Sequence, residues 1–162
     1  QYPHEGYGLQ RTVNVLRLRA GGSEAELKGR VALPEDAGQL VLGGGHAWMV
    51  RNQWWYDEVT GDYNADSSLQ AVDLQSHDGP TLTGETKLPV PYASLYQVDG
   101  RRAVVGTWWY VSGLMVYDVT DADQPRFESH VRTQGWVSDI LEHQGDLYLA
   151  TGPYGVRRLE LE

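Results

Sequence analysis

The segment GLMVYDV, residues 113–119, decides the fold, because similar segments recur along the chain. SLQAVDL (68–74) and GVRRLEL (155–161) repeat its pattern, and VNVLRL (13–18) is a fainter copy. Each alternates apolar and polar residues, which is the periodicity of a half-buried β-strand. Recurrence of one such strand indicates a tandem structural repeat.

Each of the three later copies is preceded by another predicted strand, which follows a tight glycine-containing turn. The turn glycines are Gly45, Gly100 and Gly145, which lie 55 and 45 residues apart. Two more strand-like runs per repeat lie between these motifs, next to turn-rich segments such as SHDGP and DADQP. Four short antiparallel strands in about 45 residues are typical of a β-propeller blade. The sequence therefore predicts an all-β chain of about thirteen strands, with no helix longer than two turns.

The segments GLMVYDVTDADQPRFESHV and YLATGPYGVRRLEL resemble the repeats of bacterial LVIVD-type β-propeller proteins. In that pattern a strand ending in Asp-Val-Ser/Thr-Asp leads into a proline-containing turn. The matching residues are Gly113, Leu114, Asp118, Val119, Thr120, Asp121 and Pro125. The resemblance is close over residues 95–161, looser over 40–94 and weak before residue 39. It implies a propeller fold and is not tied to one activity.

The predicted strands do not divide into whole blades. Residues 12–32 supply an incomplete blade, 39–88 and 93–133 supply one blade each, and 136–161 supply a final blade that lacks its outer strand. Propellers usually close with about four to eight blades, and exposed edges tend to pair or aggregate. We therefore expect this chain to cover roughly three to four blades of a larger propeller. The remainder would come from upstream sequence or from another chain.

Composition narrows the possible functions. The net charge is −9, from 22 acidic and 13 basic residues, and no basic stripe appears, which disfavours nucleic-acid binding. There is no cysteine, which excludes disulfides, thiolate metal sites and cysteine nucleophiles. No apolar run approaches the ~20 residues that a membrane-spanning helix needs. The sequence also has no G-x-S-x-G elbow, phosphate-binding loop or HExxH motif.

Aromatic clusters form the predicted binding surface. Two WWY triplets lie between the second and third strands of successive repeats, and further rings fall on the same predicted side of the propeller. The predicted ligand-binding residues are Trp54, Trp55, Tyr56, Trp108, Trp109, Tyr110, Trp136 and Tyr154. Flat aromatic faces stack on sugars, peptide prolines or cations. The alternative is packing between blades, and we expect at least one ring of each tryptophan pair to be buried in this way.

A candidate calcium site lies in the long connection YDEVTGDYNADSSLQAVDL. Its candidate ligands resemble those of an EF-hand-type loop, and they are Asp62, Asn64, Asp66, Ser68 and Asp73. Calcium takes about six to eight oxygen ligands, which alternating Asp and Asn side chains in a turn can supply. Ser67 replaces the usual turn glycine, and the closing acid is Asp and not Glu, so a solvated acidic turn is the alternative.

Two functional hypotheses follow. The first is a non-catalytic binding or scaffold module of an exported or cell-surface bacterial protein, secreted or in the cell envelope, with a protein or glycan partner on the aromatic side. The second is a hydrolase or lyase with its active site at the mouth of the propeller channel. The first fits the LVIVD resemblance and the lack of a catalytic motif.

Overall fold

The computed structural model describes residues 10–19, 21–22, 24–107, 113–144 and 146–160. Over these residues the chain is all-β, as predicted, and every strand is antiparallel to its neighbours. The strands are β1 (Thr12–Leu18), β2 (Ala25–Ala32), β3 (Ala37–Gly43), β4 (His46–Asp57), β5 (Asp62–Asp73), β6 (Thr81–Lys87), β7 (Ala93–Val98), β8 (Arg102–Thr107), β9 (Gly113–Asp118), β10 (Arg126–Arg132), β11 (Asp139–His143), β12 (Asp146–Ala150) and β13 (Val156–Glu160). Within this described part, the only helix is the three-residue 3₁₀ turn η1 (Gly152–Tyr154), and no helix is long and apolar enough to cross a membrane.

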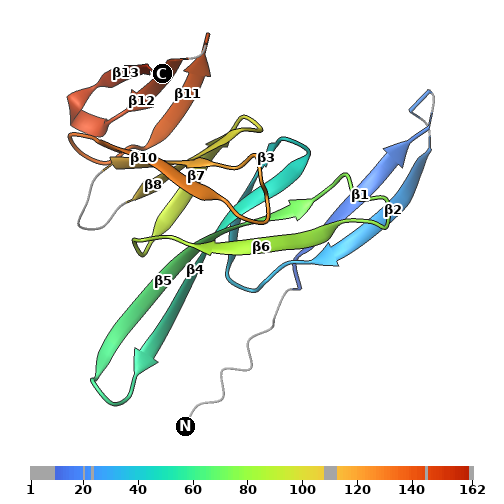
Figure 1. Cartoon of the computed structure of the whole chain (residues 1–162), viewed down its shortest axis with the longest axis horizontal. Coiled ribbons are helices and arrows are strands. Elements are labelled where there is room, and N and C mark those ends of the chain that lie inside the picture. The colour runs from blue at the N-terminus through green and yellow to red at the C-terminus, as the bar shows by residue number, and fades with distance from the viewer. Residues whose placement is uncertain (1–9, 20, 23, 108–112, 145, 161–162) are drawn as a thin grey trace.

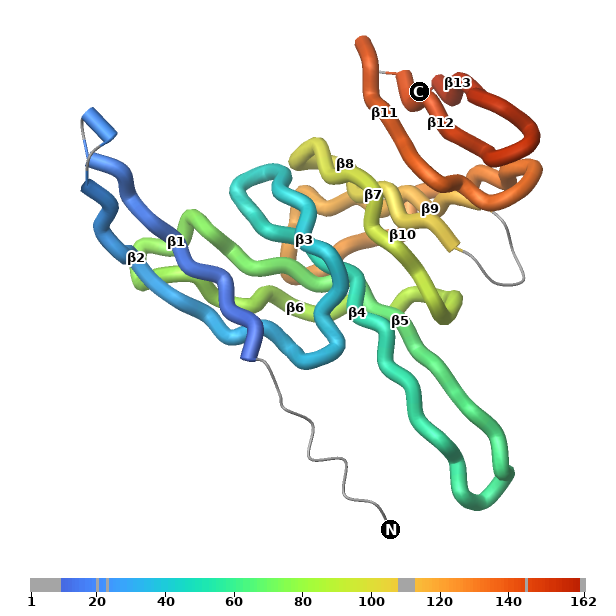
Figure 2. Tube along the Cα trace, turned by 180° about the vertical axis from the view of Figure 1, so that it is seen from behind, coloured from blue at the N-terminus to red at the C-terminus, as the bar shows by residue number. Residues whose placement is uncertain are grey.

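The strands form four sheets in which neighbours follow one another along the chain. The first sheet is β1–β2, the second β3–β6, the third β7–β10 and the fourth β11–β13. Figures 1 and 2 show the first and fourth sheets at opposite ends of an open row, so the described strands do not close into a ring.

The inner strands of the second and third sheets are buried on both faces, which explains their long apolar runs. In β4, Trp48 and Val50 pack against the third sheet, whereas Ala47 and Met49 pack against the first. A third apolar cluster joins the third and fourth sheets, and Leu147 belongs to it. Three cores between four sheets therefore hold the chain together.

The contacts at the outer edges of the sheets also recur. Gly29 in β2 lies against Pro80, in the turn between β5 and β6. Gly84 in β6 lies against the backbone of Asp123, in the turn between β9 and β10. A side chain at either glycine would collide with these atoms, so the same close approach is built twice.

The connection between β4 and β5 is a long hairpin that projects beyond its sheet. Both strands have twelve residues, but β3 pairs with β4 only as far as Arg51, and β6 pairs with β5 only from Ser68 onward. Residues 52–67, which we call the hairpin arm, are therefore paired with no other described strand, and Figure 1 shows them extending away from the sheets.

Candidate functional site

An exposed aromatic strip runs along one face of the hairpin arm. Trp54 and Tyr56 are two residues apart on β4, and Tyr63 lies directly opposite Tyr56 on β5, so the three side chains share a face. The ring centroids of Tyr56 and Tyr63 are 5.1 Å apart, and those of Trp54 and Tyr92 are 5.4 Å apart. Tyr92 precedes β7 and extends the strip toward the third sheet.

The prediction that one ring of the first tryptophan pair is buried is wrong. Trp54 is 66% exposed and Trp55 is 45% exposed. They lie on opposite faces of the arm, as alternation requires, but the neighbouring strands end before reaching them. Neither face of the arm at this level is covered by a sheet, so both rings contact solvent.

The other predicted aromatic residues divide into two groups. Trp136 and Tyr154 are exposed, and their rings lie against the backbones of Gly152 and Gly135 respectively. Figures 1 and 2 show the β10–β11 connection and η1 on the same side of the molecule as the arm. Residues 108–110, which include Trp108, Trp109 and Tyr110, lie outside the described residues.

Sequence reasoning missed the role of Tyr63 and left Tyr92 out of the binding set. The signal for Tyr63 was present, because Tyr56 and Tyr63 are equally distant from the four-residue turn Glu58–Gly61. A hairpin folded at that turn places them as a cross-strand pair.

A cleft opens at the base of the arm, beside the outer edge of β4. Its volume is about 530 Å³, and it is lined by Glu35, Asp36, Asn52, Gln53, Trp54 and Trp55. The lining residues are thus two acids, two amides and two tryptophans whose rings lie on opposite faces of the arm. Such a set can receive a cation or a hydrogen-bonding backbone.

A largely buried ion pair fixes the base of this cleft. Arg51 donates from Nε to Asp36 Oδ1 at 2.9 Å and from Nη1 to Glu85 Oε2 at 2.8 Å, and its side chain is 13% exposed. Burial raises the pKa of the Asp36 carboxyl, but the hydrogen bond and the charge of Arg51 outweigh burial and leave that pKa below its ordinary value. Asp36 is therefore ionised at neutral pH.

The Arg51–Asp36 pair predicts an acid-sensitive contribution to stability. Because the folded pKa of Asp36 is depressed, its contribution is present above the unfolded pKa of about 3.9 and is lost as pH falls through the folded value. Arg51→Met is expected to lower the free energy of unfolding by about 1–3 kcal/mol at neutral pH, and by less in acid. Urea unfolding from about pH 7 down to about pH 2.5 measures this difference. In the control background Asp36→Asn the cost of Arg51→Met should vary less with pH, and a cost that is constant with pH in both backgrounds would contradict the assignment.

The predicted calcium loop is a strand. Asp62, Asn64 and Asp66 lie two residues apart on one face of β5, at a spacing of roughly 6.8 Å for neighbours. Ligands of one calcium ion lie about 2.3–2.6 Å from it, and an extended strand does not wrap its oxygen atoms around an ion as a loop does. Asp66 pairs with Lys87 at 2.8 Å, and Ser68 is buried.

Asp73, the predicted closing acid, lies at the far end of β5 and accepts a hydrogen bond from the backbone of Gln75 at 2.8 Å. Over the described ranges, no group of three or more His, Asp or Glu side chains could hold a metal ion. The predicted loop is thus wrong, because β5 takes its place, and calcium binding stays an untested prediction.

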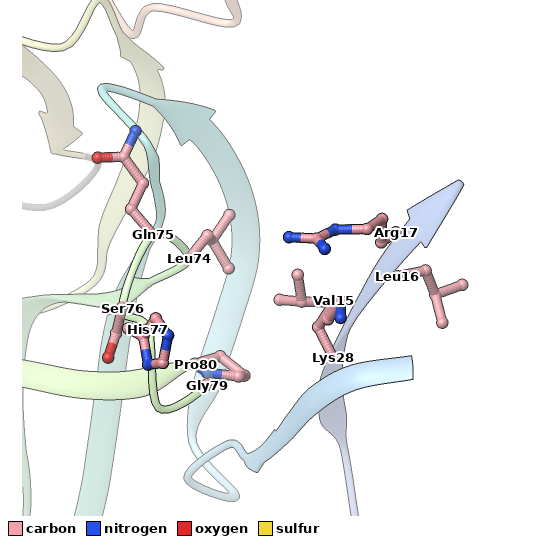
Figure 3. A pocket seen from close by; sticks show the side chains of 10 residues that line it. All are labelled: Val15, Leu16, Arg17, Lys28, Leu74, Gln75, Ser76, His77, Gly79 and Pro80. Carbon is pink, nitrogen blue, oxygen red and sulfur yellow. The ribbon is translucent and has the colours of Figure 1, made fainter. Parts of the chain in front are cut away.

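A second cavity, of about 760 Å³, lies between the first sheet and the β5–β6 turn. Figure 3 shows Val15, Arg17 and Lys28 on one wall and Leu74 and His77 on the other. Lys28 is paired with Glu26 at 3.0 Å, which offsets its charge. This cavity separates β1 and β2 of the first sheet from the β5–β6 turn of the second.

No family model, curated protein or solved structure matches the chain.

Proposed function

We propose that this chain is a non-catalytic binding or scaffold module, built as roughly three to four blades of a larger β-propeller, that engages a protein or glycan partner through the aromatic side. The hairpin arm is the central element of that side. In this proposal the protein is bacterial and is secreted or held in the cell envelope, as the LVIVD resemblance implies.

Three features support the propeller. The second and third sheets each have four strands in chain order, as blades do. Apolar clusters lie between consecutive sheets. The contacts of Gly29 with Pro80 and of Gly84 with Asp123 repeat between successive sheets with the same parts, an outer strand against the next turn.

The exposed arm is the observation that carries the binding proposal. A two-stranded hairpin is marginally stable on its own, yet this arm places Trp54, Trp55, Tyr56 and Tyr63 in solvent. Exposed apolar surface of this kind marks interaction sites. Aromatic anchors of this type are also enriched among residues that dominate binding energy.

The ring geometry favours a protein over a glycan. A sugar ring stacks on the flat face of an aromatic ring, and two adjacent rings with steeply inclined planes cannot both present a face to one flat sugar. The planes of Trp54 and Tyr92 are inclined by 85°, and those of Tyr56 and Tyr63 by 54°. Rings inclined in this way form an uneven surface, which is complementary to the uneven surface of a polypeptide and not to a flat sugar.

Arrays of immobilised peptides and glycans test this proposal. The wild-type chain is compared with the triple variant Trp54→Ser, Tyr56→Ser, Tyr63→Ser, and biolayer interferometry measures each affinity. We expect the triple variant to bind at least about tenfold more weakly, because exposed aromatic anchors supply much of the binding energy. Leu141→Ser removes an exposed apolar side chain from the fourth sheet and serves as the matched control. Equal binding by wild type and triple variant would refute the proposed surface.

A further inference from the structure

No strand in the described part of the chain pairs with the outer edge of β4 beyond Arg51. Asn52 donates its backbone N–H to the carbonyl of Asp36 at 3.4 Å, which is the last hydrogen bond toward β3. Before β3 the chain turns away, and Ala37 donates to the carbonyl of Pro34 at 3.1 Å. None of the described strands therefore occupies the line that β3 would follow along the arm.

Alternation decides which backbone groups face this edge. The N–H of Asn52 points toward β3, so the N–H and C=O groups of Trp54 and Tyr56 point the same way. The carbonyl of Asp57 accepts from Gly61 on the other side, which agrees with that alternation. Two residues of β4 thus offer donors and acceptors to an added strand.

The arm lacks three common protections of a free edge, although it carries acidic side chains. Natural edges are blunted by proline, lysine or bulges. The arm has no proline and no lysine, and its pairing runs from His46↔Asp73 to Asp57↔Asp62 without a shift in register. The edge is therefore regular enough to pair with another strand.

The charge of the arm indicates which kind of strand would pair with its free edge. The arm has four acidic residues, Asp57, Glu58, Asp62 and Asp66, and no Lys, Arg or His. A second copy of the arm would be repelled, whereas a basic segment would be attracted. Glu35, Trp54 and Trp55 line the cleft beside this edge, with the two indole rings on either face of the strand. Carboxylates and aromatic faces bind guanidinium and ammonium groups.

We propose that the edge of β4 at Trp54 and Tyr56 accepts an extended, cationic peptide segment of a protein partner. The segment lies antiparallel to β4, in line with β3, and seats a Lys or Arg side chain in the cleft beside Glu35, Trp54 and Trp55. This inference rests on the proposed binding function and specifies the chemistry of the partner.

Fluorescence anisotropy of labelled peptides tests the inference on the full chain. The probe is an alternating Arg-Thr octapeptide, and one matched peptide carries neutral citrulline in place of arginine. A third peptide keeps arginine but has N-methyl groups on the backbone amides that would face β4. Because charge-assisted contacts and strand pairing both contribute, each altered peptide should bind at least about tenfold more weakly than the probe. Equal affinity of the citrulline or the N-methyl peptide, or no probe binding at about 1 mM, would overturn the inference.

Two variants locate the bound charge. Glu35→Gln keeps the shape of the side chain and should weaken probe binding several-fold, whereas Asp78→Asn, in the exposed β5–β6 turn, should leave it unchanged. Equal effects of the two variants would mean that the peptide responds only to the overall negative charge, which contradicts a binding position in the cleft.

If arrays instead yield an uncharged ligand that requires Trp54, Tyr56 and Tyr63, this inference fails while the proposed function stands. If the probe binds but the triple aromatic variant binds it equally well, the proposed function fails.

Discussion

Trp48→Ala is expected to lower the free energy of unfolding by about 3–5 kcal/mol, because it removes a large ring from a packed core. Trp48 is 1% exposed and packs between the second and third sheets with Leu69 and Met115. Its indole Nε1 also donates to the carbonyl of Gly43 at 3.3 Å. The cavity left by alanine would lie in the seam that joins the two sheets.

Urea unfolding followed by far-ultraviolet circular dichroism measures this loss, and Trp54→Ala is the matched control. Both changes remove an indole from β4, but Trp54 is 66% exposed, so its loss should change stability by less than about 1 kcal/mol. Similar costs for the two variants would contradict the division of β4 into a buried half and an exposed arm.

The strands could be predicted from the sequence, because two signals mark them: the pattern of apolar residues and the glycines of the turns. Segments such as 68–74 and 113–119 alternate or run apolar where both faces are buried, and both lie in strands of the structure. Glycines fix the turns: Gly45 and Gly100, which have φ of 78° and 96°, lie in the predicted turns before later strands. Local pattern and turn chemistry agree there, so the prediction of an all-β chain is confirmed.

The hairpin arm could not be predicted in the same way, since its pattern has two interpretations. Oxygen-bearing residues at 62, 64 and 66 suit a calcium loop, but the same spacing also places them on one face of a strand. The alternating partners Tyr63 and Ala65 face the other way, opposite Tyr56 and Trp54. Only the pairing of β5 with β4 distinguishes a calcium loop from a strand, and this pairing depends on contacts between separate segments of the chain.

The prediction that Trp54 or Trp55 is buried was wrong for a related reason. Alternation says that Trp54 and Trp55 face opposite ways, but it does not say how far the neighbouring strands extend. β3 begins at Ala37, after the turn at Pro34, and β6 pairs with β5 only as far as Ser68. Those two limits leave both faces of the arm uncovered.

Replacement of the arm should separate binding from folding. Gln53 and Asp66 are opposite each other in the hairpin, and by the same alternation their backbone N–H and C=O groups face one another, so an Asn-Gly turn can join them in place of residues 54–65. The contacts below the cut remain, including the bond from the Asn52 amide to the carbonyl of Ala93 at 3.0 Å. We expect the free energy of unfolding in urea to change by less than about 1 kcal/mol, because none of the removed residues is buried.

Isothermal titration of this arm-replaced chain with the Arg-Thr octapeptide tests the central claim, that the arm binds a partner and is not needed for folding. The account predicts a folded protein that gives no binding heat under conditions where the wild-type chain binds the peptide. Binding with the wild-type affinity after removal of the arm would contradict it.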